Sequence, residues 1–164
     1  MMFELKINSP KETGDLAKAI AKLIKRNLII CLEGNLGAGK TLFTKNLCTA
    51  LNVKEQVTSP TFNLMNVYEG NKRVYHFDLY RLESEEDLYE IGFYEYADVT
   101  DEEGVVLIEW PDRFMDCMPE DYLYIKIERI SDDKSCEMKR NITVDVIGKK
   151  YVNLYKELEK NCQF

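Results

Sequence analysis

No part of this sequence constrains the fold more than the segment Gly34-Asn35-Leu36-Gly37-Ala38-Gly39-Lys40-Thr41. It fills every fixed position of G-x-x-x-x-G-K-[ST], the phosphate-binding P-loop. The apolar run 28–32 before it is typical of a buried parallel strand. After it, one helix face is predicted by the spacing of Phe43, Leu47, Ala50 and Leu51. The motif therefore stands in the strand–loop–helix context that phosphate binding requires.

The P-loop predicts a nucleotide site in which backbone and side chains share the binding. Its glycines let backbone N–H groups turn toward phosphate oxygens, and the following helix offers free N–H groups and the positive end of its dipole. Lys40 is expected to contact the β- and γ-phosphates, and the Thr41 hydroxyl to ligate Mg²⁺. The predicted nucleotide-binding residues of this segment are Asn35, Leu36, Gly37, Ala38, Gly39, Lys40, Thr41 and Leu42.

Motifs that the chain lacks select among P-loop proteins. Asn71-Lys72 is followed by Arg73-Val74, so the sequence contains no N-K-x-D guanine box, and no D-x-x-G switch follows the P-loop. This favours adenine over guanine, and ATP with Mg²⁺ are the predicted cofactors. The chain that remains after Thr41 leaves little room for the acceptor and lid segments of a typical small-molecule kinase.

Length and charge limit the kind of protein and its partners. The 164 residues predict a single domain over 1–164, and no apolar run approaches the roughly 20 residues that span a bilayer, so no membrane association is expected. With 22 basic and 29 acidic side chains, the formal net charge is −7. Because an acidic chain repels a polyphosphate backbone, RNA is expected to be recognised only through a partner.

The cysteine pattern indicates a reducing compartment. Five cysteines are scattered without a C-x-x-C pair, namely Cys31, Cys48, Cys117, Cys136 and Cys162. An odd, unpaired set favours free thiols over disulfides or a zinc site. The predicted location is the cytoplasm.

The remaining patterns predict a sheet with helices on its faces. The expected strands are 3–7, 28–32, 61–68, 73–80 and 105–110, followed by an antiparallel pair at 122–130 and 138–147. The expected helices are 10–26, the one after the P-loop, 84–91, a short turn at 93–97, and a C-terminal helix that includes 151–158. The predicted class is α/β, a three-layer P-loop NTPase-like domain with a mixed β-sheet flanked by helices.

Two carboxylates are candidates for the second half of the nucleotide site. Glu109 ends an apolar strand, where a P-loop protein needs a carboxylate that holds Mg²⁺ directly or through water. Asp78 lies on an otherwise apolar strand, where a carboxylate is costly without a partner. It either orients the attacking water or the metal shell, or it pairs with Arg81 or His76.

Three further polar residues have both a functional and a structural interpretation. Ser59 and Thr61 either present hydroxyls to the γ-phosphate or form an ordinary polar turn before a strand. His76 is the only histidine, and we interpret it as a strand residue whose hydrogen bonding is satisfied.

Taken together, these motifs resemble the TsaE (YjeE) family of bacterial P-loop ATPases. The resemblance rests on Gly34–Thr41, Ser59-Pro60-Thr61-Phe62, His76-Phe77-Asp78-Leu79-Tyr80-Arg81, Glu90 with Gly92, and Ile108-Glu109-Trp110-Pro111. Order and spacing agree over roughly residues 9–113, and the second and third blocks are more specific than the P-loop alone. From Phe114 onward the chain carries no motif of this kind.

The resemblance implies a role in making N6-threonylcarbamoyladenosine, the modified base beside the anticodon of tRNAs that read codons beginning with adenine. Family members act with the TsaB–TsaD pair, which transfers the threonylcarbamoyl group. The implied partners are therefore TsaD and TsaB in a ternary complex, with tRNA contacted only through them. The implied activity is ATP hydrolysis that is weak in the isolated chain and depends on the partners.

The same resemblance assigns roles to individual residues. It implies that Asp78, Lys40 and Glu109 are catalytic, and that Thr41 and Glu109 hold the metal. Ser59 and Thr61 become a switch-like loop. The residues outside the P-loop that it places against the nucleotide are Thr13, on the adenine side, with Ser59, Thr61, Asp78 and Trp110.

Two other functions stay open at this point. A small nucleoside or metabolite kinase is suggested by Asp112-Arg113-Phe114, because an Asp-Arg-aromatic triplet occurs in deoxynucleoside kinases. A nucleotide-gated adaptor would bind ATP and dock without turning it over.

Overall fold

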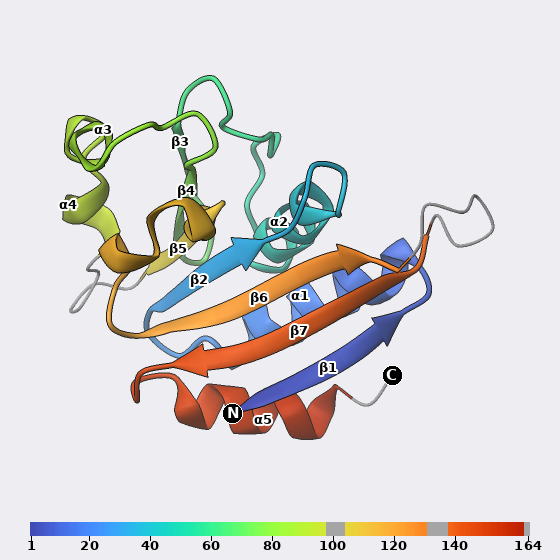
Figure 1. Cartoon of the computed structure of the whole chain (residues 1–164). Helices are drawn as coiled ribbons and strands as arrows, with labels where there is room; N and C mark the ends of the chain where they lie inside the picture. Colours follow the sequence, from blue (N-terminus) through green and yellow to red (C-terminus); the bar gives the residue numbers. More distant parts are fainter. Residues whose placement is uncertain (98–103, 131–137, 163–164) are drawn as a thin grey trace.

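The computed structural model describes residues 1–97, 104–130 and 138–162 and is built on one seven-stranded sheet (Figure 1). The strands are β1 Met2–Ile7, β2 Leu28–Glu33, β3 Met65–Tyr68, β4 Arg73–Asp78, β5 Gly104–Glu109, β6 Tyr122–Arg129 and β7 Arg140–Ile147. The helices are α1 Pro10–Leu23, α2 Lys40–Ala50, α3 Glu85–Glu90, α4 Phe93–Ala97, α5 Val152–Asn161 and the 3₁₀ helix η1 Pro111–Cys117.

The sheet is mixed, and β2 lies at its centre. Its order is β1-β7-β6-β2-β5-β4-β3. The pairs β2–β5, β2–β6 and β4–β5 are parallel, whereas β1–β7, β6–β7 and β3–β4 are antiparallel. The carboxyl ends of β2, β5 and β4 therefore meet at one edge of the sheet, which is where ligands bind in open α/β folds.

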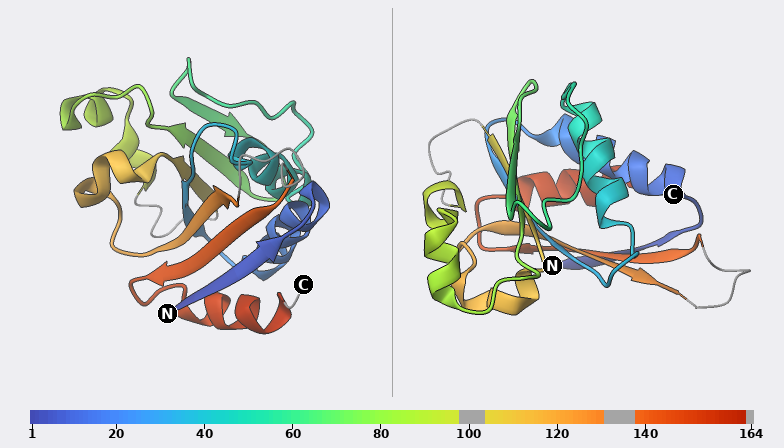
Figure 2. Two further views of the ribbon diagram at one scale, coloured as in Figure 1. Left: turned by 45° about the vertical axis from the view of Figure 1, so that its right-hand side comes forward. Right: turned by 90° about the horizontal axis from the view of Figure 1, so that it is seen from above.

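Helices lie on both faces of the sheet, so the predicted α/β class with a mixed, helix-flanked sheet is confirmed. α1, α2 and α5 cover one face, and α3, α4 and η1 lie against the β5–β4 half of the other (Figures 1 and 2). No described helix covers β1, β7 and β6 on that second face. β2 and β5 are buried along almost their whole length, as expected of central parallel strands.

Two predicted helix boundaries hold and one is wrong. Ser9 caps α1, accepting a hydrogen bond from the Glu12 amide at 3.4 Å. The helix ends at Leu23 rather than near Arg26, because the buried residue Ile24 is already extended (φ −73°, ψ 106°). Ser84 caps α3 through a capping box, as the sequence predicts.

The expected strand 61–68 is shorter than predicted. β3 begins only at Met65, because residues 60–64 form a turn that is closed by the Leu64 amide on the Pro60 carbonyl at 2.6 Å. Leu64 takes a left-handed backbone (φ +64°), an unusual conformation for a residue of this type. The turn keeps residues 60–64 out of the β3–β4 ladder, whose pairs begin at Met65.

The structure also bears on the predicted end of β4, on the cysteines and on the lengths of the helices. β4 ends at Asp78 and not at Tyr80, since the Asp78 carboxylate accepts the Tyr80 amide at 2.9 Å and bends the chain out of the sheet. Cys31, Cys48, Cys117 and Cys162 are free thiols, as predicted, and Cys136 lies outside the described residues. None of the described helices is long and apolar enough to cross a lipid bilayer.

Candidate nucleotide-binding site

The P-loop joins the central strand to a helix whose first turn is open. β2 ends at Glu33, and α2 begins at Lys40 without a side-chain cap. Gly37 (φ +77°) and Gly39 (φ +119°) occupy backbone conformations that favour glycine. Because the first N–H groups of a helix have no partner within the helix, those of α2 are available to an anion. The loop therefore has the backbone geometry of a phosphate cradle.

A cavity of about 340 Å³ opens beside this loop. It is lined by Leu36, Gly37, Gly39, Lys40, Thr41, Ser59, Thr61, Asp78, Tyr80, Glu109 and Trp110. All of these except Tyr80 belong to the predicted site. They come from the P-loop, the loop before β3 and the ends of β4 and β5, so the fold brings together segments that are far apart in the sequence.

Lys40 is held inside the loop by backbone carbonyls. Its ammonium group donates to the Gly34 carbonyl and, at 3.2 Å, to that of Asn35. It also lies 4.2 Å from the centre of the Trp110 ring. Burial lowers the pKa of Lys40 below its ordinary value, and the nearby Glu109 carboxylate opposes this shift. A phosphate group would oppose it further.

Asp78 is buried and connects the sheet to the loop before β3. One oxygen of its carboxylate accepts hydrogen bonds from the hydroxyls of Thr61 at 3.0 Å and Ser59 at 3.3 Å, and the other accepts the Tyr80 amide. The two hydroxyls also lie 2.8 Å apart. The pairing with Arg81 or His76 that the sequence left open does not occur. Instead, Asp78 and the two hydroxyls form one polar cluster on the cavity wall.

Glu109 lies next to Asp78 in the sheet and pairs with His76. Asp78 and Glu109 are register partners on the parallel strands β4 and β5. His76 Nε2 lies 2.8 Å from one carboxylate oxygen of Glu109, and both side chains are almost fully buried. His76 is therefore hydrogen-bonded through Nε2, to the carboxylate predicted to hold the metal, whereas its buried Nδ1 has no partner among the described residues, so the expected satisfied histidine is only half confirmed.

We predict that His76→Leu lowers the free energy of unfolding by about 3 kcal/mol, because it leaves the Glu109 carboxylate buried without a partner. Urea denaturation measures the loss. His76→Gln keeps an N–H donor in a side chain of similar reach and is expected to lose less than half as much. Equal stability of the His76→Leu variant and the original chain would show that the pair contributes nothing.

Trp110 and Tyr80 form an aromatic wall of the cavity. Their ring centroids are 4.8 Å apart. Trp110 follows β5 directly and has a left-handed backbone (φ +60°) before Pro111. Backbone strain of this kind is concentrated at binding and catalytic sites. Tyr80 was not predicted as a site residue, although it lies two residues beyond Asp78 on the same predicted strand.

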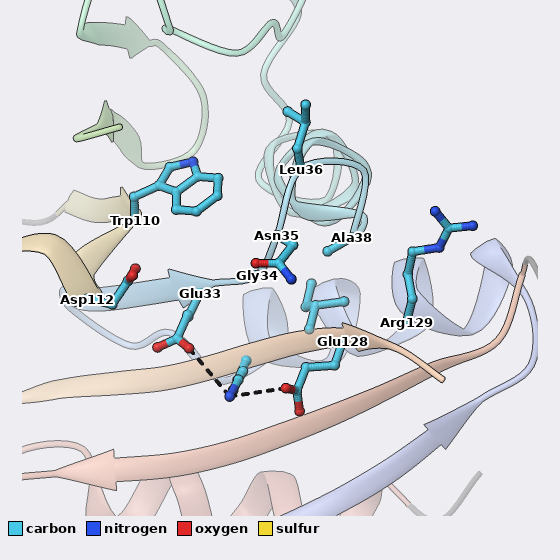
Figure 3. A pocket seen from close by; sticks show the side chains of 11 residues that line it. Glu33, Gly34, Asn35, Leu36, Ala38, Trp110, Asp112, Glu128 and Arg129 are labelled. Carbon is cyan, nitrogen blue, oxygen red and sulfur yellow. Dashed lines mark ion pairs between the residues drawn. The ribbon is translucent and has the colours of Figure 1, made fainter. Parts of the chain in front are cut away.

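Four residues of the predicted site do not line this cavity. Thr13 is buried in the first turn of α1, and Leu42 lies in the first turn of α2, where its carbonyl accepts a hydrogen bond from the side-chain amide of Asn46 at 2.9 Å. Asn35 and Ala38 belong to the P-loop but face a second cavity of about 490 Å³ (Figure 3).

The second cavity is larger, but two of its acidic side chains are already paired with a lysine. Glu33 and Glu128 are both paired with Lys126, at 3.5 and 3.1 Å, as the dashed lines of Figure 3 show. Tyr124 also donates its hydroxyl to Glu33. The first cavity, by contrast, contains two buried carboxylates and the P-loop lysine, so we place the candidate chemistry there.

Arg113, one of the residues that suggested a kinase, makes a structural hydrogen bond to the backbone. Its guanidinium donates to the Leu82 carbonyl at 2.8 Å and does not line the first cavity. Asp112 borders the second cavity. The triplet therefore contributes no side chain to the cavity that contains Lys40.

Comparison with known proteins identifies the group to which the chain is related. A family model described as "Threonylcarbamoyl adenosine biosynthesis protein TsaE" matches residues 7–142. The chain belongs to the TsaE family. Proteins named tRNA threonylcarbamoyladenosine biosynthesis protein TsaE are similar to it. That of Bacillus subtilis is 37% identical over 154 residues, covering 93% of this chain and 91% of the relative. That of Treponema pallidum is 38% identical, covering 83% and 95%.

A solved structure has the same fold. The crystal structure of Bacillus subtilis YdiB matches with a TM-score of 0.75 at 32% identity, covering 98% of this chain and 96% of that one. The predicted family and α/β fold are thus confirmed, and the chain is a TsaE-family protein of tRNA threonylcarbamoyladenosine biosynthesis.

Proposed function

We propose that this TsaE-family protein binds and hydrolyses Mg–ATP, and that hydrolysis supports threonylcarbamoyl transfer to tRNA by a TsaB–TsaD pair. The observation that carries the proposal is the meeting of Lys40, Thr41, Asp78 and Glu109 around the open first turn of α2. This set combines cation, hydroxyl and carboxylates as P-loop phosphoryl chemistry requires.

Phosphate binding follows from the loop and its lysine. The N–H groups of the first turn of α2 and of the loop bind the phosphate oxygens. Lys40 exchanges its hydrogen bonds with the Gly34 and Asn35 carbonyls for bonds to the β- and γ-phosphates. Since burial disfavours its charge, the anionic ligand offsets a cost that is already present in the protein.

The donor set around Thr41 and Glu109 fits Mg²⁺. Both are oxygen donors, and Mg²⁺ is commonly held by one or two carboxylates together with substrate phosphates. Among the described residues, no group of three His, Cys, Asp or Glu side chains could hold a metal, and this mode of binding does not need one. His76 occupies one oxygen of Glu109 and orients the other. Bound Mg²⁺ neutralises charge on the phosphate oxygens.

Asp78 is the group best placed to act on the attacking water. Its carboxylate lines the cavity and is fixed by hydrogen bonds from Ser59, Thr61 and the Tyr80 amide. A water that donates to Asp78 attacks the γ-phosphorus, the bond to the β–γ bridging oxygen breaks, and ADP and phosphate leave. The Ser59 and Thr61 hydroxyls bind the same carboxylate oxygen of Asp78. A change at this carboxylate during hydrolysis therefore alters the position of the loop before β3.

Exposed apolar side chains on two loops near the cavity favour a protein partner over direct RNA contact. Leu36 is 90% exposed on the P-loop, and Phe62 is 81% exposed in the loop that carries Ser59 and Thr61. Exposed apolar side chains beside a site are typical of protein interfaces. The net charge of −7 opposes contact with tRNA, which the TsaB–TsaD pair would then make.

The test is steady-state ATP hydrolysis by the purified chain, alone and with the TsaB–TsaD pair. We expect a low rate alone that rises at least about tenfold with the partners, since a partner that covers the cavity excludes bulk water and fixes the loop. Modification of tRNA is followed in the same mixtures. A rate that the partners leave unchanged would contradict the coupled mechanism, and phosphorylation of a nucleoside would favour a kinase.

A further inference from the structure

An arginine at the start of β7 contacts the backbone of the P-loop. Arg140, the first residue of β7, donates from Nε to the Ala38 carbonyl at 2.6 Å and from Nη2 to the Gly37 carbonyl at 3.5 Å. Its side chain is half-buried. Hydrogen bonds from a charged donor are stronger than those between neutral groups. The contact joins two segments about a hundred residues apart in the sequence.

These carbonyls are the ones that a phosphate cradle has to direct outward. When a loop points its N–H groups at an anion, the carbonyl group of each of these peptides points away from the anion. The Gly34 and Asn35 carbonyls are engaged by Lys40, which has to leave them in order to bind phosphate. The Gly37 and Ala38 carbonyls are engaged by Arg140 from outside, so that contact persists when Lys40 moves.

The strand next to β7 supports the same loop. A Cβ atom on Gly34 would lie 2.6 Å from the Ile127 carbonyl oxygen of β6, so the loop rests directly on that strand. β6 and β7 are paired along their length, with Arg129 opposite Arg140. Both strands of the β6–β7 pair therefore contact the loop, β6 through the Ile127 backbone and β7 through the Arg140 side chain.

We propose that Arg140 is a positioning residue that holds the P-loop in its phosphate-binding conformation, and thereby sets the affinity for the β- and γ-phosphates. The inference rests on the proposed binding of ATP. It gives a role in the site to the C-terminal third of the chain, in which the sequence showed no motif.

The test compares Arg140→Met with Arg129→Met by isothermal titration calorimetry, using ADP, a non-hydrolysable ATP analogue and AMP. Loss of charge-assisted hydrogen bonds is expected to raise the Kd of ADP and of the analogue about tenfold in Arg140→Met. The Kd of AMP, which has no β- or γ-phosphate, is expected to change less than about threefold. A merely structural role would weaken all three ligands alike.

Arg129→Met is the matched control. Arg129 is exposed on the neighbouring strand, its side chain makes no hydrogen bond to a described residue, and it lines the second cavity together with Ala38 (Figure 3). The control loses the same charge and is expected to keep the original Kd values. If it weakens ADP as much as Arg140→Met does, long-range charge explains the effect and the proposal fails.

Arg140→Lys keeps the charge and removes the guanidinium fork. We expect it to bind ADP almost as weakly as Arg140→Met, because an ammonium cannot reach both carbonyls in the same way. It also serves as the test if Arg140→Met does not fold. Full affinity in Arg140→Lys would overturn the proposal. Failure of the original chain to bind ATP would instead overturn the proposed function.

Discussion

Replacing Lys40 with alanine is expected to lower kcat/KM for ATP by about 10²–10³-fold, the range measured when one preorganised electrostatic donor is removed. Among the described residues that line the cavity, Lys40 alone is cationic, and burial has already removed part of its hydration, so little solvent has to be displaced when phosphate binds. Hydrolysis with and without the TsaB–TsaD pair, and tRNA modification in cells that depend on this protein, measure the effect.

A matched control separates this effect from a general loss of charge on α2. Lys45 lies on the exposed side of the same helix, and Lys45→Ala is expected to leave both activities unchanged. Thermal unfolding shows whether Lys40→Ala remains folded. A folded Lys40→Ala variant that still supports full tRNA modification would refute the dependence on ATP.

Asp78→Asn is expected to lower the rate of the hydrolytic step by about 10²–10⁴-fold, as is typical when a group that positions or accepts a proton is lost. The amide preserves the shape of the side chain and can still accept the Tyr80 amide. Nucleotide affinity is therefore expected to stay within about threefold of the original. Single-turnover hydrolysis measures the step, and calorimetry measures the affinity.

The same variant separates an ATPase from a nucleotide-gated adaptor. If hydrolysis and tRNA modification are lost together while binding and docking persist, turnover is required. If Asp78→Asn modifies tRNA normally, bound nucleotide alone is sufficient and the hydrolytic coupling proposed here is wrong. Asp116→Asn, an exposed carboxylate on η1, is the control and is expected to behave like the original chain.

Much of the candidate site could be predicted because its determinants are local. Positive φ at Gly37 and Gly39 and the open first turn of α2 follow from a few consecutive residues. Asp78 and Glu109 were each identified as a carboxylate on an apolar strand, but the expected strand ran on to Tyr80, and the pairing of β4 with β5 decided that the two carboxylates are neighbours.

Local patterns failed where a tertiary contact competes with them. Residues 61–64 have the composition of a strand, yet the Thr61 hydroxyl binds Asp78 and the Leu64 amide closes a turn on Pro60. The gain from satisfying a buried carboxylate outweighs a few strand hydrogen bonds at the edge of the sheet. The sequence could not weigh these two possibilities because the position of Asp78 relative to the loop depends on the folded sheet.

By itself, therefore, the sequence determined the strand–loop–helix of the P-loop and the family, and it named as candidates the two carboxylates that line the cavity, because backbone preferences and hydrophobic periodicity act over short distances. Only the tertiary structure decided that His76 pairs with Glu109, that Tyr80 joins the cavity wall and that Arg140 contacts the P-loop backbone. The order of strands in the sheet sets these contacts, and a chain carries no local signal for which distant strand will lie beside which.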